Sequence, residues 1–263
     1  MELISATEPS CSSVVYLPHH PVRKEDGLTT KIRVVFNASG NTSNQTSLND
    51  HLFVGPKLQT NLPTILMRWR QHKFVYILDI AKMFRQIIMH PADRDYQRIL
   101  WRSSPQSAIQ SYRLRTITYG IAPAPYLAIR VLHQLARDEG DRFPLARSIL
   151  LNETYVDDIL FGANDIETAN ATRVQLIDLL AAGGFRLRKW AANYNAMLED
   201  VPQKDQAMAS EYPLEEKPSI KVLGISWSPR NDSFKFKVSL PPSAASTKRS
   251  VLSTVARVFD PLG

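Results

Sequence analysis

Cysteine is almost absent from this chain of 263 residues, and its scarcity excludes two kinds of structure. Cys11 is the only cysteine, so the chain can form no internal disulfide and no zinc site built on cysteine ligands. Histidine offers no clear metal site either, because two of the six histidines are adjacent and the other four are scattered along the chain. A reducing compartment is therefore the expected setting.

Long apolar runs are missing as well. Residues 1–8 have neither the basic stretch nor the apolar core of a secretory signal. No run elsewhere approaches the roughly 20 apolar residues that a membrane-spanning helix needs. We therefore expect a soluble, intracellular protein with no membrane partner.

Basic charge and apolar residues are plentiful. The 32 Lys and Arg residues outnumber the 25 Asp and Glu residues, which gives a net charge of +7 and a pI near 9.5. This balance favours a polyanionic partner such as nucleic acid, although many basic enzymes bind none. A hydrophobic content of 44% is enough for a sizeable core, in one large domain or two small ones.

An acidic pair, Asp157 and Asp158, lies between two apolar runs. The runs cover residues 149–151 and 159–162, and we interpret them as the strands of a tight β-hairpin with both carboxylates at its turn. Aspartate is common in turns because its side chain hydrogen-bonds its own backbone. Taken alone, the pair could therefore be an ordinary solvated turn.

A third carboxylate, Asp79, changes that interpretation. It closes the apolar run 74–80, which is typical of a buried strand, and a buried carboxylate needs a partner or a cation. If this strand neighbours the hairpin, the carboxylates meet at one sheet edge, repel one another and raise one another's pKa. Such an oxygen-rich site suits Mg²⁺, and with two ions it suits phosphoryl or nucleotidyl transfer.

Two further segments combine strand character with cations. Lys31 and Arg33 alternate at the start of the strand predicted over residues 31–38, where they could face solvent or hold a triphosphate. Residues 185–190 form an alternating strand with one basic face. The first segment could therefore contribute to a nucleotide-binding site.

The order of elements predicts an α+β fold. From residue 65 onward, helix, strand, insertion, helix, hairpin, helix and strand follow one another, a pattern typical of a small antiparallel sheet backed by helices. In the helix over 165–182 the expected buried stripe consists of Val174, Ile177, Leu180 and Ala181. Other helices are predicted over 62–70, 126–138 and 246–259, and other strands over 96–102, 112–118, 220–228 and 233–238.

These residues resemble the motifs of reverse transcriptases. Residues 78–84 resemble motif A, residues 119–125 resemble motif B, and Tyr155-Val156-Asp157-Asp158 matches the YxDD box of motif C. Residues 184–190 stand where motif D belongs, and 222–225 resemble the primer grip. The amino-acid sequence most resembles that of BEL/Pao-type LTR retrotransposons, notably at residues 16–20, 33–39, 48–50 and 259–263. A YxDD box alone is weak, but five motifs in order, with 157 − 79 = 78 residues between the acidic sites, are specific.

The resemblance implies the right-hand architecture of polymerases. The palm would be an antiparallel sheet of the RRM or ferredoxin-like kind, backed by helices. Fingers would comprise residues 1–55 and 87–124, the palm 56–86 and 125–240, and residues 241–263 the start of a truncated thumb.

The resemblance also implies a chemistry and residues that perform it. Asp79 and Asp157 would ligate two Mg²⁺ ions, with Mn²⁺ as a possible substitute, and Asp158 would complete the acidic cluster. Lys189, or Arg188 in its place, would protonate the leaving pyrophosphate. The deoxynucleotide would contact Lys31, Arg33, Ile80, Lys82, Met83, Phe84, Tyr119 and Gly120, and primer or template would contact Tyr155, Leu223 and Gly224.

Phe84 would be the steric gate, occupying the space that a ribose 2′-hydroxyl needs, although it could also be ordinary core. Tyr119 departs from the glutamine that retroviral enzymes carry before the motif B glycine, and we interpret it as a subfamily difference. The implied partners are an RNA or DNA template, a DNA primer, deoxynucleotides and the remaining thumb and ribonuclease H portions of a polyprotein, in a cytoplasmic virus-like particle.

Two alternatives remain at this stage. The chain could be a catalytically inactive nucleic-acid-binding remnant of such an element. It could also be an RRM-like RNA-binding module whose sheet happens to carry acids, although three acids at a sheet edge would repel phosphate in the absence of metal.

Overall fold

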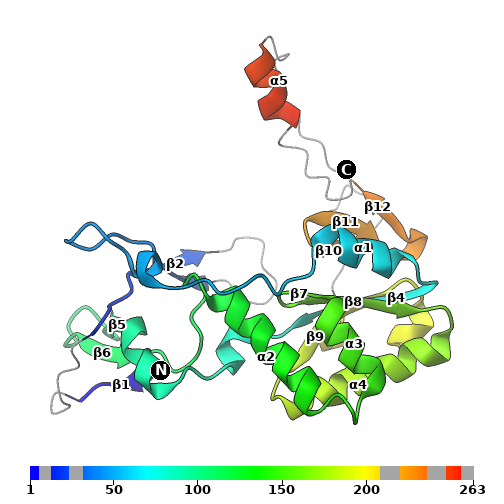
Figure 1. The fold of residues 1–263 in the computed structure, drawn as a ribbon, viewed down its shortest axis with the longest axis horizontal. Helices are drawn as coiled ribbons and strands as arrows, with labels where there is room; N and C mark the ends of the chain where they lie inside the picture. The colour runs from blue at the N-terminus through cyan, green and yellow to red at the C-terminus, as the bar shows by residue number, and fades with distance from the viewer. Residues whose placement is uncertain (6–12, 24–31, 208–219, 236–246, 256–263) are drawn as a thin grey trace. The chain divides into compact units, whose positions relative to one another are not determined.

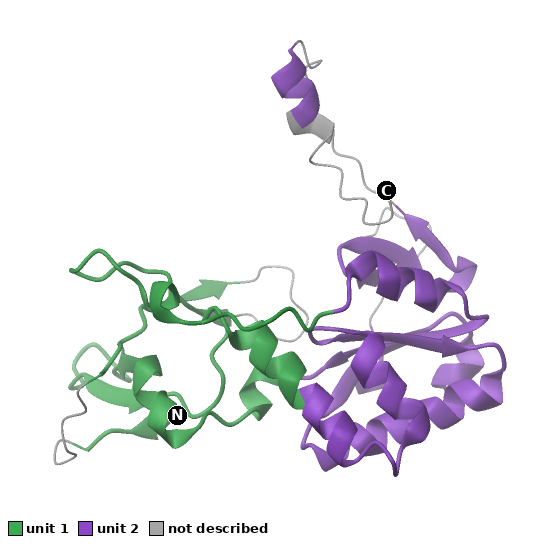
Figure 2. Cartoon of the chain, viewed as in Figure 1, with its two compact units in different colours: residues 1–59, 82–131 green, residues 60–81, 132–263 purple. Residues whose placement is uncertain are grey.

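The computed structural model describes residues 1–5, 13–23, 32–207, 220–235 and 247–255; Lys31 lies outside them. The chain forms two compact units (Figure 2). Unit 1 consists of residues 1–59 and 82–131, and unit 2 of residues 60–81 and 132–263. The two units alternate along the chain, and the division into fingers and palm segments stays a prediction. No described helix is long and apolar enough to span a bilayer.

The centre of unit 2 is a four-stranded antiparallel sheet with the strand order β7-β8-β4-β9 (Figure 1). Its central strand β4 is buried over almost its whole length, because its sequence FVYILDI is apolar on both faces. The strands are β4 (Phe74–Ile80), β7 (Thr154–Tyr155), β8 (Asp158–Ala163) and β9 (Leu187–Ala192).

Both faces of this sheet are covered. Helices α3 (Pro144–Asn152) and α4 (Ile166–Ala182) lie on one side, and α1 (Leu62–Arg70) lies on the other together with a second sheet (Figure 1). The second sheet is antiparallel and contains β10 (Ile220–Val222), β11 (Ile225–Ser228) and β12 (Ser233–Lys235). The predicted strand over 220–228 is thus itself a hairpin.

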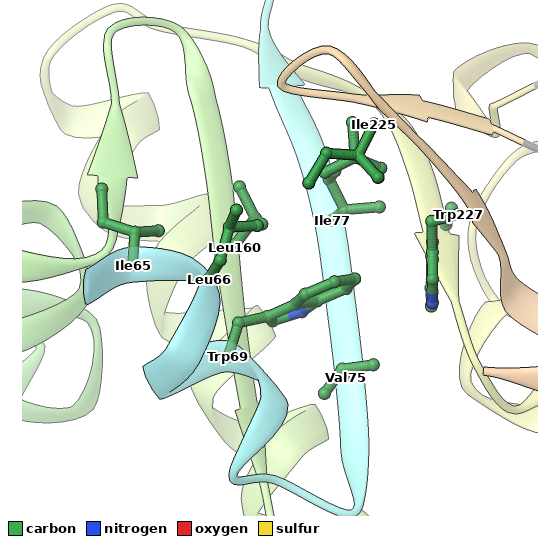
Figure 3. Packing of buried hydrophobic residues seen from close by; sticks show 10 residues of the cluster. Ile65, Leu66, Trp69, Val75, Ile77, Leu160, Ile225 and Trp227 are labelled. Carbon is green, nitrogen blue, oxygen red and sulfur yellow. The ribbon is translucent and has the colours of Figure 1, made fainter. Parts of the chain in front are cut away.

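A hydrophobic cluster holds α1, the four-stranded sheet and the second sheet together. Figure 3 shows Ile65, Leu66 and Trp69 of α1 packing beside β4 and β8, with Ile225 and Trp227 of β11 on the same side of β4. Trp69 and Trp227 are fully buried. Burying a large aromatic side chain contributes roughly 2–3 kcal/mol, so this cluster is a major source of unit 2 stability.

The prediction of a strand at residues 149–151 was wrong, because these residues belong to α3. Pro144 stands in the first turn of that helix, where a missing backbone N–H costs nothing, and Ala146, Ile149 and Leu150 form its buried face. A short apolar run fits a buried helix as well as a buried strand. The upstream arm of the acidic hairpin is therefore only the two-residue strand β7.

The predicted stripe of α4 was also partly wrong. Val174 and Ile177 are 50% and 40% exposed, whereas Leu180 is buried as expected. The buried face is rotated and includes Arg173, whose guanidinium pairs with Asp200. Apolar residues occur on more than one face of this helix, so periodicity alone did not select the buried one.

The described residues of unit 1 form two small antiparallel sheets. One has the strand order β1-β6-β5, and the other pairs β2 with β3. Asp95 forms ion pairs with both Arg98 and Arg113 and so links β5 to β6. The strands of these two sheets are β1 (Glu2–Leu3), β2 (His19–Arg23), β3 (Ile32–Phe36), β5 (Arg98–Trp101) and β6 (Gln110–Arg113).

Two remaining helices were expected from the sequence. Helix α2 covers Ala124–Asp138, close to the prediction over 126–138. Helix α5 covers Lys248–Val255, and the rest of the helix predicted over 246–259 lies outside the described residues.

Candidate active site

The structure brings the three aspartates together at one end of the central strand pair. Asp79 at the end of β4 stands opposite Asp158 at the start of β8 in the strand register. The backbone N–H of Ile80 donates a hydrogen bond of 2.8 Å to the carbonyl oxygen of Asp157. A backbone hydrogen bond thus joins two residues that are 77 apart in sequence (157 − 80 = 77).

The turn of the acidic hairpin differs from the prediction by one residue. Tyr155 pairs with Asp158, so Val156 and Asp157 form the turn and Asp158 begins the strand. Val156 has φ 55°, a left-handed conformation that is unusual for a β-branched residue. Strained conformations of this kind concentrate at functional sites.

Burial and electrostatic repulsion between carboxylates raise the pKa values of Asp157 and Asp158. Burial raises the pKa of Asp157 and the Asp79 carboxylate raises it further, against the opposing effect of Lys189 and Arg188. Burial, followed by the charges of Asp157 and Asp79, raises the pKa of Asp158 to about 7. The protein thus holds carboxylates where a cation would relieve their repulsion.

Asp79 itself is neutralised by two basic residues of β9. Arg188 Nε donates to Asp79 Oδ1 at 2.9 Å, and Lys189 Nζ donates to Asp79 Oδ2 at 2.6 Å. Consecutive residues of a regular strand point to opposite faces and could not both reach one carboxylate. Here the β4–β9 register shifts between Ile77 and Asp79, and Lys189 adopts φ 56°. This β-bulge turns both cations toward Asp79.

The donor set suits a hard divalent cation, since carboxylate oxygens are the ligands that Mg²⁺ prefers. Within the described ranges, however, no three His, Cys, Asp or Glu side chains form a group that could hold a metal ion as they stand. Both oxygens of Asp79 instead accept hydrogen bonds from Arg188 and Lys189.

The first two backbone amides after Asp79 already have partners within the chain. The N–H groups of Ile80 and Ala81 donate to the Asp157 and Arg186 carbonyls, each at 2.8 Å, so contact of Ile80 with a nucleotide would not use its amide. Met83 is 1% exposed, whereas Phe84 is half-buried. Lys82 is exposed and has φ 52°.

The motif B candidates lie in unit 1 against β3. The Tyr119 hydroxyl donates to the Val34 carbonyl at 2.5 Å, and its ring meets Phe36 edge-on with centroids 5.5 Å apart. Gly120 has φ 104°, and a Cβ there would lie 2.6 Å from the Phe36 carbonyl oxygen. Arg33 is exposed on the same strand. No side chain larger than glycine fits at position 120 without strain.

Asn49 is a residue whose role sequence reasoning missed. Its side chain donates to the Gly120 carbonyl at 3.0 Å and accepts from the Ala122 N–H at 2.8 Å, so it holds the motif B turn. The run Leu48-Asn49-Asp50 was noticed only as part of the resemblance, because nothing local connects it with residue 120.

The primer and template candidates pack on the hydrophobic cluster. Tyr155, next to the acidic turn, and Leu223, at the β10–β11 turn, both contact it from partly buried positions. Leu223 and Gly224 form that two-residue turn with φ 48° and 91°. The cluster therefore links the acidic hairpin with the hairpin that resembles a primer grip.

The fold is that of a polymerase with fingers and palm. The crystal structure of prototype foamy virus protease-reverse transcriptase is similar, with a TM-score of 0.53 and 18% sequence identity over 92% of this chain. The chain spans only 27% of the length of that protein.

Residues 22–226 match the family described as reverse transcriptase (RNA-dependent DNA polymerase). This match covers well over half of the chain, so the chain belongs to the reverse transcriptase family. A comparison with curated proteins finds no match.

Proposed function

We propose that the chain is the RNA-directed DNA polymerase domain of a BEL/Pao-like LTR retrotransposon, adding deoxynucleotides to a primer 3′-hydroxyl on an RNA or DNA template. The convergence of Asp79, Asp157 and Asp158 is the observation that carries the proposal. Family membership supports the reaction class. The retrotransposon type rests on the sequence resemblance alone, as does an origin in cytoplasmic virus-like particles.

Asp79, Asp157 and Asp158 would hold the divalent ions, Mg²⁺ or Mn²⁺. The ions would supply activation of the primer 3′-hydroxyl and neutralisation of the charge on the reacting phosphates. Asp79 would exchange its present partners, Arg188 and Lys189, for this role. The side chains of Arg188 and Lys189, no longer paired with Asp79, would then face the phosphates of the nucleotide. Lys189 could donate its proton to the leaving pyrophosphate.

The remaining site residues would bind and select the nucleotide. Phe84, five residues after Asp79, would exclude the ribose 2′-hydroxyl. The exposed side chains of Lys82 and Arg33, with Lys31, would meet the β- and γ-phosphates. Tyr119 and Gly120 would form the surface near the base. Tyr155, Leu223 and Gly224 would contact primer and template.

Primer extension on poly(rA)/oligo(dT) tests the proposal. The full chain should incorporate dTTP with Mg²⁺, and Asp157→Asn should abolish incorporation, because one carboxylate of the acidic cluster loses its charge. Asp178→Asn, an exposed acid of α4, is the matched control and should leave incorporation unchanged. Activity that survives Asp157→Asn would reject the mechanism.

The ion pairs of Asp79 support a second candidate. With Arg188 and Lys189 on its two oxygens, Asp79 could be purely structural and the chain a non-catalytic nucleic-acid-binding remnant. Filter binding with a salt titration, alongside extension, separates the two: a remnant binds primer–template and does not extend it under any metal condition.

A further inference from the structure

The position of the second sheet of unit 2 depends on side chains. Its strands β10, β11 and β12 pair with one another and with none of β7, β8, β4 and β9. Among the described strands, no backbone ladder therefore fixes the β10–β11 turn relative to the three aspartates. Whatever holds this sheet on α1 and β4 determines where that turn lies.

An aromatic stack provides the apolar part of this attachment. The Trp69 ring of α1 meets Trp227 of β11 edge-on, with centroids 4.9 Å apart, and lies 6.0 Å from the Phe234 ring of β12. Trp69 Nε1 donates to the Tyr76 carbonyl of β4 at 3.0 Å. Figure 3 shows Trp69 between the helix and β4, with Trp227 beside them. One side chain thus contacts α1, β4 and the second sheet.

Arg70 and Asp232 provide the polar part. Arg70 Nη1 pairs with Asp232 Oδ1, and Arg70 Nη2 donates to the Asp232 carbonyl at 3.2 Å. Trp227 Nε1 donates to the same Oδ1 at 3.0 Å. The guanidinium also lies 5.5 Å from the Phe234 ring centroid, within reach of a cation–π contact. Asp232 therefore receives hydrogen bonds from both α1 and β11.

The β10–β11 turn is a conformation that needs such support. Leu223 and Gly224 both have positive φ, which defines a two-residue hairpin loop of the primed kind. Leucine at φ 48° is strained, and strain persists only where surrounding structure overdetermines it. Leu223 packs on the same cluster as Trp69 and Trp227.

We propose that Arg70 and Asp232 are positioning residues that fix the Leu223–Gly224 turn relative to the acidic site and thereby set where the primer strand is held. The inference rests on the proposed function, because it assigns the turn to primer contact. Neither residue needs to touch the nucleotide. Loss of the pair should therefore weaken primer–template binding without changing the apparent affinity for deoxynucleotide.

A double-mutant cycle on the full chain tests the pair. Arg70→Met and Asp232→Asn should each raise the Kd for a fluorescein-labelled primer–template, measured by anisotropy, by roughly three- to tenfold. The double variant should be little worse than either single one, because both remove the same interaction. Steady-state extension should show a similar rise in KM for primer–template and an unchanged KM for dTTP. Arg70→Lys keeps the charge and should recover part of the binding.

Arg147→Met, a change on α3 of the same unit, is the matched control, since it removes a surface ion pair with Asp141. Hydrogen exchange of the amides of residues 220–228 should accelerate in Arg70→Met and not in Arg147→Met. Equal primer–template Kd in wild type and Arg70→Met, or a loss that Arg147→Met reproduces, overturns the inference. A chain that binds primer–template without extending it rejects only the proposed activity, and the Kd series still decides the positioning role. A chain that neither binds nor extends rejects both.

Discussion

Asp79 and Asp158 occupy opposite positions on neighbouring antiparallel strands, so the buried carboxylate of Asp79 and the half-buried carboxylate of Asp158 share one end of the β4–β8 ladder. Like charges directly opposite each other destabilise a strand pair. Arg188 and Lys189 pair directly with Asp79, whereas Asp158 forms neither of these ion pairs and feels Lys189 only as a nearby charge. We expect the uncompensated part of this repulsion to reduce the stability of the folded chain.

Removing the charge of Asp158 should therefore stabilise the chain when metal is absent. We expect Asp158→Asn in EDTA to raise the free energy of unfolding by about 1 kcal/mol and the Tm by about 2–4 °C. The same variant should extend primers poorly. Thermal unfolding followed by circular dichroism measures the shift, with the exposed Asp178→Asn as control. A lower Tm for Asp158→Asn would contradict this and show that the Asp158 carboxylate stabilises the folded chain.

Glu153, at the junction of α3 and β7, should make stability depend on pH. Burial raises the pKa of its carboxyl to about 7, although Arg68 acts in the opposite direction, and its Oε2 has no hydrogen-bond partner in the structure. Because the pKa is raised in the folded state, the folded chain holds the proton more tightly than the unfolded chain. Stability should fall as pH rises from about 4.5 to 7.

Glu153→Gln should remove the part of that fall that Glu153 contributes, while Asp158, whose pKa is also raised to about 7, keeps its own part. Urea unfolding at pH 5 and pH 8 should show the variant gaining about 2 kcal/mol on wild type between the two values. Glu167→Gln, on the exposed first turn of α4, should have the same free energy of unfolding as wild type at pH 5 and at pH 8. Parallel pH profiles for Glu153→Gln and wild type would contradict the assignment of a buried, uncompensated carboxyl.

Gly120 should tolerate no side chain. Gly120→Ala places a Cβ 2.6 Å from the Phe36 carbonyl oxygen and forces alanine to φ 104°, so we expect a loss of about 1–3 kcal/mol of stability. Gly184→Ala is the matched control, since it also has positive φ but nothing lies within 4 Å of its Cβ. Urea unfolding of both variants isolates the clash, and equal losses would mean that backbone strain alone matters at residue 120.

Phe84 should select the sugar. Phe84→Val removes the ring and should raise the efficiency of ribonucleotide relative to deoxynucleotide incorporation by roughly 10- to 100-fold, while Phe84→Tyr keeps the ring and the selectivity. Single-nucleotide incorporation with each nucleotide measures the ratio. An unchanged ratio in Phe84→Val would remove Phe84 from the role of gate.

The meeting of the acidic residues could be predicted because it depends on strand burial. The run around Asp79 is apolar on both faces, which identifies a central strand, and an acid at its end needs a partner. The α+β layout and the helices α1, α2 and α4 could also be predicted, because the spacing of apolar residues along the sequence indicates the type of element that buries them.

Other features could not be predicted because they depend on tertiary context. Residues 149–151 are equally apolar in a helix or a strand, and only packing placed them in α3. The bulge that directs Arg188 and Lys189 together onto Asp79 is a property of strand register, which no local pattern shows. The contact of Asn49 with Gly120 joins residues far apart in sequence.

Binding of Mn²⁺ to the three aspartates tests the central claim most directly. Mn²⁺ prefers the same oxygen ligands as Mg²⁺ and can be followed by electron paramagnetic resonance as the free-ion signal falls. In the presence of dTTP and primer–template, the wild-type chain should bind Mn²⁺ beyond what dTTP binds alone, and Asp79→Asn, Asp157→Asn and Asp158→Asn should each weaken that binding by tenfold or more. Equal Mn²⁺ binding by wild type and all three variants would contradict the account.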